Sequence, residues 1–211
     1  MSPNQDYGLT AKQVRTLQGL DRPGKVQDFL NGLHANFEED GPTCRSPRAV
    51  LEAGEAHCME GAMLAALAFR MHGRAPLIVD LEAAPPDVDH VIAVFKERGY
   101  WGAVSRTNHA VLRYREPVYR NLRELVMSYF HEYFTNTDGK KTLRRYSRPV
   151  DLSMFDAEGW TASKEDVWCV PEYLAEALHY KLLEPWQTRG LRIADDPEIV
   201  AGRIKVETRP L

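Results

Sequence analysis

The sequence predicts an α+β fold, because helix-like and strand-like segments occupy different parts of the chain. Apolar residues at helical spacing dominate residues 10–73, whereas short apolar runs separated by turn residues follow Gly73. Segregation of helices from strands is typical of α+β proteins. A chain of 211 residues is also long enough to bury one sizeable core.

Four helices are expected in the N-terminal half, over residues 10–19, 23–35, 46–54 and 58–73. Thr10 and Asp21 are suitable caps for the first two, and Pro23 is tolerated in a first helical turn. The last of the four begins at Cys58 and is the most helix-like segment in the chain. Small Ala and Gly residues along it allow close packing against other elements.

Strands are expected at residues 77–81, 90–95, 100–105 and 110–114. The turn residues 96–99 join the second and third of these into a hairpin. Folding the hairpin about residues 97 and 98 places Ser105 roughly opposite His90, within a slip of one or two residues. The hairpin therefore brings a hydroxyl group towards an imidazole.

The C-terminal part of the sequence is less regular. Its expected elements are a helix at 121–134, turn-rich structure at 135–168, a helix from Pro171 that carries Leu182, and an edge strand or tail at 204–206. We predict a core formed by residues 1–134 and an extension, residues 135–211, that packs on it. Together they are expected to form one compact domain.

Composition argues against several functional classes. The net charge is −3 and no long basic run occurs, so a nucleic-acid-binding protein is not indicated. The longest apolar stretch, residues 62–69, is too short to span a membrane. No secretory signal precedes the fold, and the three cysteines form an odd set without metal-ligand spacing. Reduced thiols in the cytoplasm are the simplest interpretation.

Cys58 is the strongest indication of chemistry, because it lies at the start of a helix. A thiol there faces unpaired backbone N–H groups and the positive end of the helix dipole, which both favour the nucleophilic thiolate. His90, at the start of the expected second strand, completes a nucleophile–base pair. An isolated cysteine or histidine is usually an ordinary buried residue. The pairing of Cys58 with His90 is what favours a catalytic role for both.

Other histidines are weaker candidates. His57 adjoins the thiol, but neighbouring residues point in different directions, so we expect it to be exposed or to make a loop contact. His109 is an alternative base. A metal site is less favoured than a cysteine enzyme, because no Cys-x-x-Cys or His-Glu-x-x-His pattern is present.

The order of these motifs resembles the transglutaminase-like superfamily of papain-type cysteine enzymes. The matching stretches are Ser46–Gly54, His57–Ala62, Asp89–Val94 and Trp101–Ser105, within roughly residues 20–115. The resemblance implies an α+β, transglutaminase-like or papain-like fold. In it, a helical N-terminal half presents the cysteine against an antiparallel sheet that presents the histidine, and later helices cover one edge.

The resemblance also implies a Cys–His–Asp triad, but this sequence has Ser105 where the family has the aspartate. Either Ser105 or Asn108 would then orient His90. The implied activity is amide hydrolysis or acyl transfer by Cys58 on a peptide or other amide-containing substrate, with no cofactor. The alternative is a catalytically weakened domain that serves as a binding or scaffold protein. Oligomeric state is left open.

Overall fold

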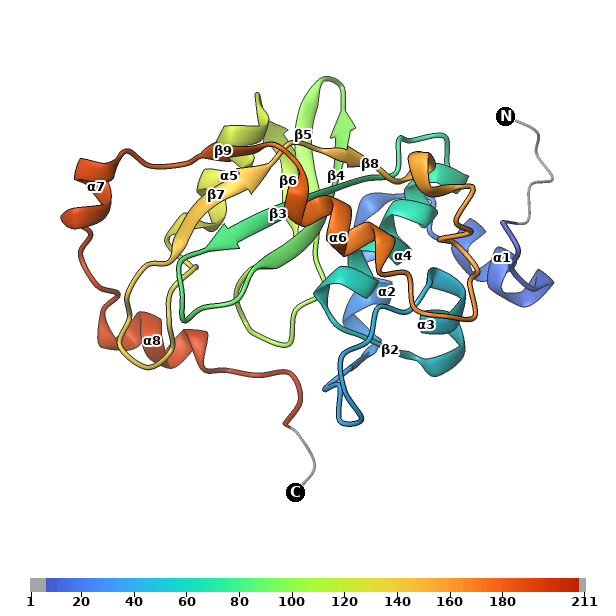
Figure 1. Cartoon of the computed structure of the whole chain (residues 1–211), viewed down its shortest axis with the longest axis horizontal. Helices are drawn as coiled ribbons and strands as arrows, with labels where there is room; N and C mark the ends of the chain where they lie inside the picture. The colour runs from blue at the N-terminus through green and yellow to red at the C-terminus, as the bar shows by residue number, and fades with distance from the viewer. Residues whose placement is uncertain (1–6, 209–211) are drawn as a thin grey trace.

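The computed structural model describes residues 7–208 and has the α+β architecture that the sequence predicts. The strands of its main sheet are β3 (Leu77–Ala83), β4 (His90–Glu97), β5 (Tyr100–Val104), β6 (Arg115–Tyr119), β7 (Leu143–Ser147), β8 (Val150–Asp151) and β9 (His179–Lys181). Their order is β6-β5-β4-β3-β7-β9, with β8 also paired to β3, and all these pairs are antiparallel (Figure 1).

Four N-terminal helices precede this sheet, as predicted: α1 (Ala11–Gln18), α2 (Pro23–Asn31), α3 (Pro47–Ala53) and α4 (Cys58–Met71). Thr10 caps α1, because its Oγ1 accepts from the Gln13 backbone N–H at 3.3 Å. The predicted cap Asp21 is wrong: Arg22 holds the cap position of α2, and Asp21 forms an ion pair with Lys25 at 3.0 Å.

The helix α2 ends earlier than predicted, at Asn31. Gly32 follows it and is a poor helix former. The next residues form β1 (His34–Ala35), which pairs in parallel with β2 (Glu55–Ala56) just before α4. This small pair joins the end of α2 to the start of the cysteine helix.

The predicted hairpin is β4 and β5, joined by a turn at Arg98 and Gly99. Both turn residues have positive φ, 50° and 90°, as a tight two-residue hairpin turn requires. The strands pair Glu97 with Tyr100, a slip of two residues from the predicted pairing. A slip of two residues preserves the face to which each side chain points, so Ser105 stays on the same side as His90.

The predicted strand at residues 110–114 is wrong, since β6 begins only at Arg115. Leu112 has φ of 60°, which is incompatible with an extended strand. The predicted helix at 121–134 is shorter, and α5 spans Leu122–Phe130 with Asn121 as its cap.

Residues beyond 134, predicted as an extension that packs on the core within one compact domain, contribute β7, β8 and β9 to the main sheet. Tyr146 of β7 lies opposite Leu81 of β3, and β9 continues the sheet outward from β7. The predicted helix from Pro171 through Leu182 is also too long. The remaining helices are η1 (Leu152–Phe155), α6 (Cys169–Glu176), α7 (Pro185–Arg189) and α8 (Asp196–Gly202).

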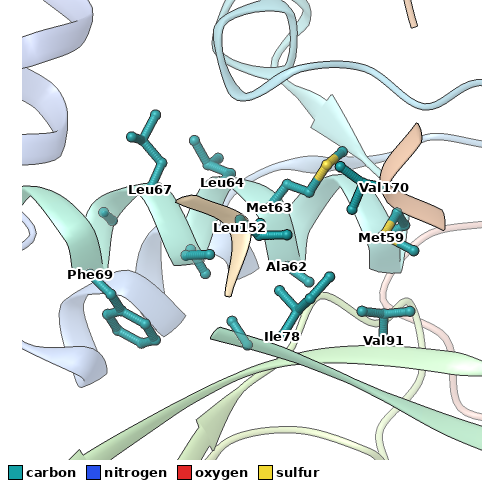
Figure 2. Close-up of a cluster of buried hydrophobic side chains, with 14 of the residues drawn as sticks. Met59, Ala62, Met63, Leu64, Leu67, Phe69, Ile78, Val91, Leu152 and Val170 are labelled. Carbon is teal, nitrogen blue, oxygen red and sulfur yellow. The ribbon is translucent and has the colours of Figure 1, made fainter. Parts of the chain in front are cut away.

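Helix α4 is the centre of the larger hydrophobic core (Figure 2). It is buried on all sides from Met59 to Phe69 and packs on Ile78 and Val91 of the sheet. Its length is 14 residues, whereas a membrane-spanning helix needs about 20. No helix within residues 7–208 is long and apolar enough to cross a membrane.

A second core covers the opposite face of the sheet. Val79 belongs to this core although its neighbour Ile78 belongs to the first, as expected for alternating side chains in a strand. Leu125, Val126 and Tyr129 of α5 pack in the second core. The prediction that later helices cover an edge is therefore wrong for α5, which covers a face.

Candidate functional site

The Cys58 side chain is held at the end of the sheet by the first turn of α4. The thiol is half-buried, and burial alone would raise its pKa. Hydrogen bonds from His57 and His90 outweigh the burial and lower the pKa of Cys58 from 9.0 to about 5. The other thiols differ: burial raises the pKa of Cys44 to about 12, and also raises the pKa of Cys169.

His90 is the first residue of β4 and is buried. His90 is one of the two histidines that lower the pKa of Cys58. Its Nε2 lies 2.6 Å from the Oγ of Ser105, which is also buried. The structure thus brings Cys58 and His90 together in one cavity, with Ser105 hydrogen-bonded to the imidazole.

Gln27 fixes the backbone of Ser105 from both sides. The Gln27 Nε2 donates to the Ser105 carbonyl at 2.9 Å, and the Ser105 N–H donates to the Gln27 Oε1 at 2.9 Å. Gln27 is a buried polar residue on α2. No local pattern marks it, because its partner lies 78 residues away in the sequence.

His57 makes the loop contact that the sequence analysis allowed, and it also lines the cavity beside Cys58. It is the N-cap of α4: its Nδ1 accepts from the Met59 N–H at 3.3 Å, and its Nε2 lies 2.9 Å from the Thr43 carbonyl oxygen. Burial alone would lower the pKa of His57. Its hydrogen bond with Cys58 and the charge of Glu60 instead raise it from 6.5 to about 9.

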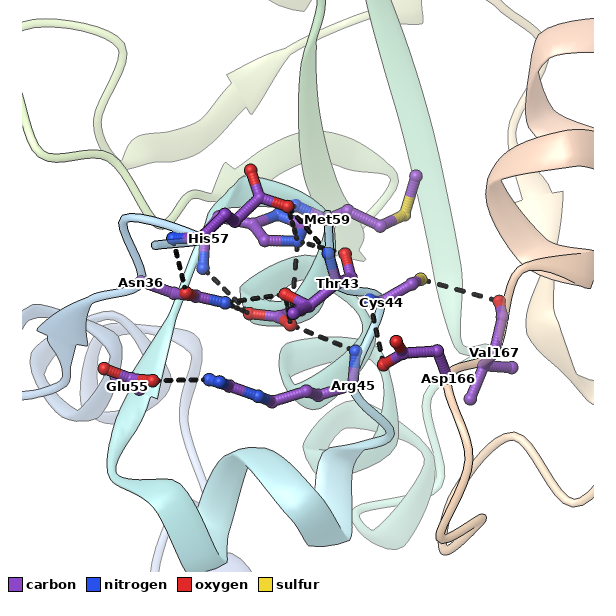
Figure 3. A network of polar contacts seen from close by, with 11 residues as sticks. Asn36, Thr43, Cys44, Arg45, Glu55, His57, Met59, Asp166 and Val167 are labelled. Atoms are coloured by element: carbon purple, nitrogen blue, oxygen red, sulfur yellow. Dashed lines mark hydrogen bonds and ion pairs between the residues drawn. The ribbon is translucent and has the colours of Figure 1, made fainter. Parts of the chain in front are cut away.

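Glu60 is a fully buried carboxylate in the network of polar contacts around His57, Asn36 and Thr43 (Figure 3). It accepts hydrogen bonds from the Asn36 Nδ2 at 3.0 Å, the Thr43 Oγ1 at 2.9 Å, the Arg45 N–H at 3.0 Å and the His57 N–H at 3.1 Å. Burial alone would raise its pKa, but the charge of His57 and these donors hold it below the ordinary 4.5.

The sequence does carry a signal for the pairing of His57 with Glu60. The spacing of His57 and Glu60 is that of a capping box, in which the third helical residue reaches back to the cap. Histidine is an uncommon cap, which explains why the pattern escapes a search based on serine, threonine or aspartate.

Asn108 lies near the site but is engaged elsewhere. Its Nδ2 donates to the Glu207 carbonyl at 2.9 Å, and its Oδ1 accepts from the Glu207 N–H at 2.9 Å. His109 likewise directs its Nδ1 to the Gly202 carbonyl, 3.2 Å away. Of the two predicted partners for His90, the structure therefore pairs Ser105 with the ring and Asn108 with the C-terminal segment.

The thiol opens into a cavity of about 170 Å³ whose lining includes His57, Cys58, His90, Asn108 and Phe37. A larger cavity of about 390 Å³ adjoins it and shares Phe37. Within residues 7–208, no three His, Cys, Asp or Glu side chains are arranged to hold a metal ion. The cavity is suited to chemistry by the thiolate and its two histidines.

No protein-family model matches this chain, and no curated protein matches it. The geometry around Cys58 is therefore the basis for assigning a chemistry.

Proposed function

We propose that this protein is a cysteine enzyme of transglutaminase-like type that cleaves amides and transfers the acyl group to water or to an amine. One observation carries the proposal. The thiol of Cys58 lies on the first turn of a helix, in a cavity that His90 also lines, and is the cysteine whose pKa falls while those of Cys44 and Cys169 rise.

In the first half-reaction, the proton of the Cys58 thiol passes to His90, and the thiolate attacks the amide carbonyl carbon. A C–S bond forms, the C–N bond breaks, and the leaving amine takes the proton from His90. The N–H group of Cys58 lies at the start of α4, where no helical carbonyl is available to it, and is suited to stabilise the oxyanion.

In the second half-reaction, water or an amine attacks the thioester. The attacking group gives a proton to His90 as it bonds to the carbonyl carbon, the C–S bond breaks, and the thiolate of Cys58 is restored. Ser105 holds the ring through Nε2, which leaves the opposite nitrogen free for proton transfer. The fold supports this assignment, since a cysteine helix packed on a histidine-bearing antiparallel sheet is the arrangement expected of a transglutaminase-like enzyme.

A test needs only a broad set of amides. A tryptic digest of casein is incubated with the protein, with and without a fluorescent primary amine, and the products are identified by mass spectrometry. We expect hydrolysed or amine-modified amides with the parent protein and with Cys44→Ala, and none with Cys58→Ala. Equal products from Cys58→Ala would refute the proposal.

The second candidate is a binding or scaffold domain without turnover, and the neutral Ser105 at the position of the family's acid favours it. If the parent protein modifies none of these amides and forms no thioester at Cys58, the result would support this candidate. Mass analysis of the intact protein after exposure to the digest distinguishes the two, because an acyl-enzyme adds the mass of an acyl group.

A further inference from the structure

The cavity beside Cys58 contains a buried arginine that the proposed mechanism does not use. Arg106 follows Ser105 directly in the segment after β5, and it lines the cavity of about 170 Å³ together with Cys58 and His90. Only 3% of the surface of Arg106 is exposed. An arginine side chain stays positively charged at physiological pH, so the cavity wall carries a fixed cation.

The guanidinium of Arg106 is only partly satisfied by the protein. Its Nη1 donates to the Thr107 carbonyl at 2.7 Å, and its Nη2 donates to the Leu33 carbonyl at 3.0 Å. Within residues 7–208, its Nε has no hydrogen-bond partner and the group forms no ion pair. Buried charges are normally paired, so Arg106 lacks a counter-charge.

The acidic group that acts on Arg106 is engaged elsewhere. Glu207 influences Arg106 through its charge. One Glu207 carboxylate oxygen accepts from the Ala35 N–H at 3.1 Å, and the other lies 3.3 Å from the Nδ1 of His34. Burial lowers the pKa of Arg106 from 12.5 despite this charge, which indicates that the guanidinium is poorly compensated.

Other polar side chains of the cavity wall have partners in the protein. Four of them are bonded to other parts of the chain: Asn36, His57, Asn108 and His109. Arg106 differs from these four, because it has a charge and N–H groups that the protein leaves unused. A molecule that enters the cavity to reach Cys58 therefore meets a cation with spare donors.

We propose that Arg106 binds a carboxylate of the substrate, so that the enzyme acts on amides that carry a free carboxylate within a few bonds of the scissile bond. The inference rests on the proposed function and names its substrate class. The short spacing follows from the cavity, whose volume of about 170 Å³ holds both Cys58 and Arg106 in its lining. The last peptide bond of a peptide and the monoamide of a dicarboxylic acid both fit this description.

A carboxylate matches Arg106 better than a phosphate does. The planar guanidinium fits the two oxygens of a carboxylate. It supplies one positive charge, which balances a carboxylate but leaves a phosphate dianion half uncompensated. The charge of Glu207 opposes a second negative charge at this place.

The test compares two reagents that alkylate Cys58 through the same carbon but differ in charge. Iodoacetate carries a carboxylate, whereas iodoacetamide carries a neutral amide of nearly the same shape. The rate of alkylation by iodoacetamide against pH has its midpoint at the thiol pKa, and both reagents are compared at pH 7, above the pKa of about 5. Peptide mass mapping measures the reaction at Cys58. The ratio of the two rates cancels the reactivity of the thiolate itself.

Arg106→Gln is expected to lower the ratio of the iodoacetate rate to the iodoacetamide rate by about tenfold, because a charge-assisted hydrogen bond to the carboxylate is lost. Arg113→Gln is the matched control. It removes the same charge from a cation that acts on Arg106 but does not line the cavity. Its ratio is expected to stay within about twofold of the parent value, because salt screens such a charge. A ratio that is unchanged in Arg106→Gln, or that falls equally in both variants, would overturn the proposal.

Arg106→Gln also loses the hydrogen bonds to Thr107 and Leu33, and this variant is at risk of not folding. Protection of the parent protein then decides the question. N-acetylglycine is expected to slow the reaction of Cys58 with iodoacetamide, whereas N-acetylglycinamide, its neutral counterpart, is not. Equal protection by the two, or by neither, would overturn the proposal.

Inorganic phosphate is the third competitor in the protection experiment. It is expected to protect Cys58 less than N-acetylglycine does. Equal protection by phosphate would show a general anion site and overturn the assignment to carboxylates. None of these readouts depends on turnover, so failure of the proposed function is seen separately in the casein digest.

Discussion

The three cysteine thiols acquire different properties from their neighbours. Cys44 is buried and directs its sulfur to the Val167 carbonyl, 3.5 Å away, which gives a thiolate no stabilising cation. Cys58 is flanked by His57 and His90. The same residue type is therefore inert in one place and acidic in the other, and Cys44 serves as an internal control for Cys58.

Substitutions at Ser105 and at Asn108 are expected to differ in their effect on the orientation of His90. Ser105→Ala removes the hydrogen bond to the ring and is expected to slow Cys58 alkylation at pH 6 by about three- to tenfold. Asn108→Ala is expected to leave the pH midpoint unchanged, because its amide is bonded to Glu207. The pH profiles of both variants check this, and the reverse result would assign the orienting role to Asn108.

The Cys58 thiolate also makes stability depend on pH. Its folded pKa of about 5 lies below the ordinary 9.0, so its stabilisation is present above the unfolded value and is lost as pH falls through 5. The raised pKa of His57, about 9 instead of 6.5, gives stabilisation that is present below 6.5 and lost as pH rises through 9. Between about 6.5 and 9 the two slopes cancel.

Below about pH 6.5 the slope from His57 is absent. Burial raises the pKa of Asp80 from 3.8 to about 6, which gives an opposing slope below pH 6, but this slope is common to the parent protein and Cys58→Ser. From pH 6.5 to 5, the parent protein is therefore expected to lose about 2 kcal/mol of unfolding free energy relative to Cys58→Ser. Urea denaturation at pH 5, 6 and 7 measures this difference. Cys44→Ser is expected to show no such trend, because the Cys44 thiol, with a pKa of about 12, stays protonated throughout.

At the scale of elements, α4 and the segment after β5 must approach closely for the site to form. Gly61 permits this, since a Cβ atom there would overlap the Cβ of Arg106. Arg106 directly follows Ser105, so any displacement at Gly61 is transmitted to the residue that holds His90. Gly61 has ordinary helical backbone angles, so the site requires glycine for the space it leaves and not for its conformational freedom.

Gly61→Ala is expected to destabilise the protein by about 1–3 kcal/mol and to raise the pH midpoint of Cys58 alkylation. Gly24→Ala is the matched control, because Gly24 lies in α2 with no atom near the added methyl group. Its expected effect is neutral or stabilising, since alanine is the better helix former. Thermal unfolding and the alkylation profile of both variants check the prediction.

Local signals made much of this arrangement predictable. The helix that begins at Cys58 follows from the apolar run up to Gly73, and the tight turn at Arg98 and Gly99 brings Ser105 to the side of His90. The partners made by distant segments were not predictable in this way. Gln27 and the insertion of β7 beside β3 depend on tertiary pairing, for which neither propensity nor periodicity carries a signal.

At the scale of the whole molecule, the segment after α8 returns to the site. Ala110 donates to the Ile204 carbonyl at 3.0 Å, Val206 donates to the Asn108 carbonyl at 2.9 Å, and a Glu207 carboxylate oxygen accepts from the Ala35 N–H at 3.1 Å. These bonds connect β1 with the loop after β5 along the rim of the cavity.

Ending the chain after Gly202 is expected to cost about 1–3 kcal/mol of stability, because these hydrogen bonds are lost. The pH midpoint of Cys58 alkylation is expected to stay unchanged, since the removed residues that the structure describes, 203–208, form no hydrogen bond or ion pair with Cys58 or His90. Bulky maleimides are expected to react with Cys58 faster in the truncated protein than in the parent protein, because the rim of the cavity opens. A shifted midpoint would show that the segment supports the site directly.

This return of the chain has a consequence during protein synthesis. The helix that carries Cys58 and the hairpin that carries His90 leave the ribosome long before residue 207, and they fold from largely local contacts. The rim of the cavity closes only when Glu207 reaches Asn108 and Ala35. During the synthesis of about half the protein, a nascent chain is therefore expected to hold Cys58 in a cavity whose rim is still incomplete.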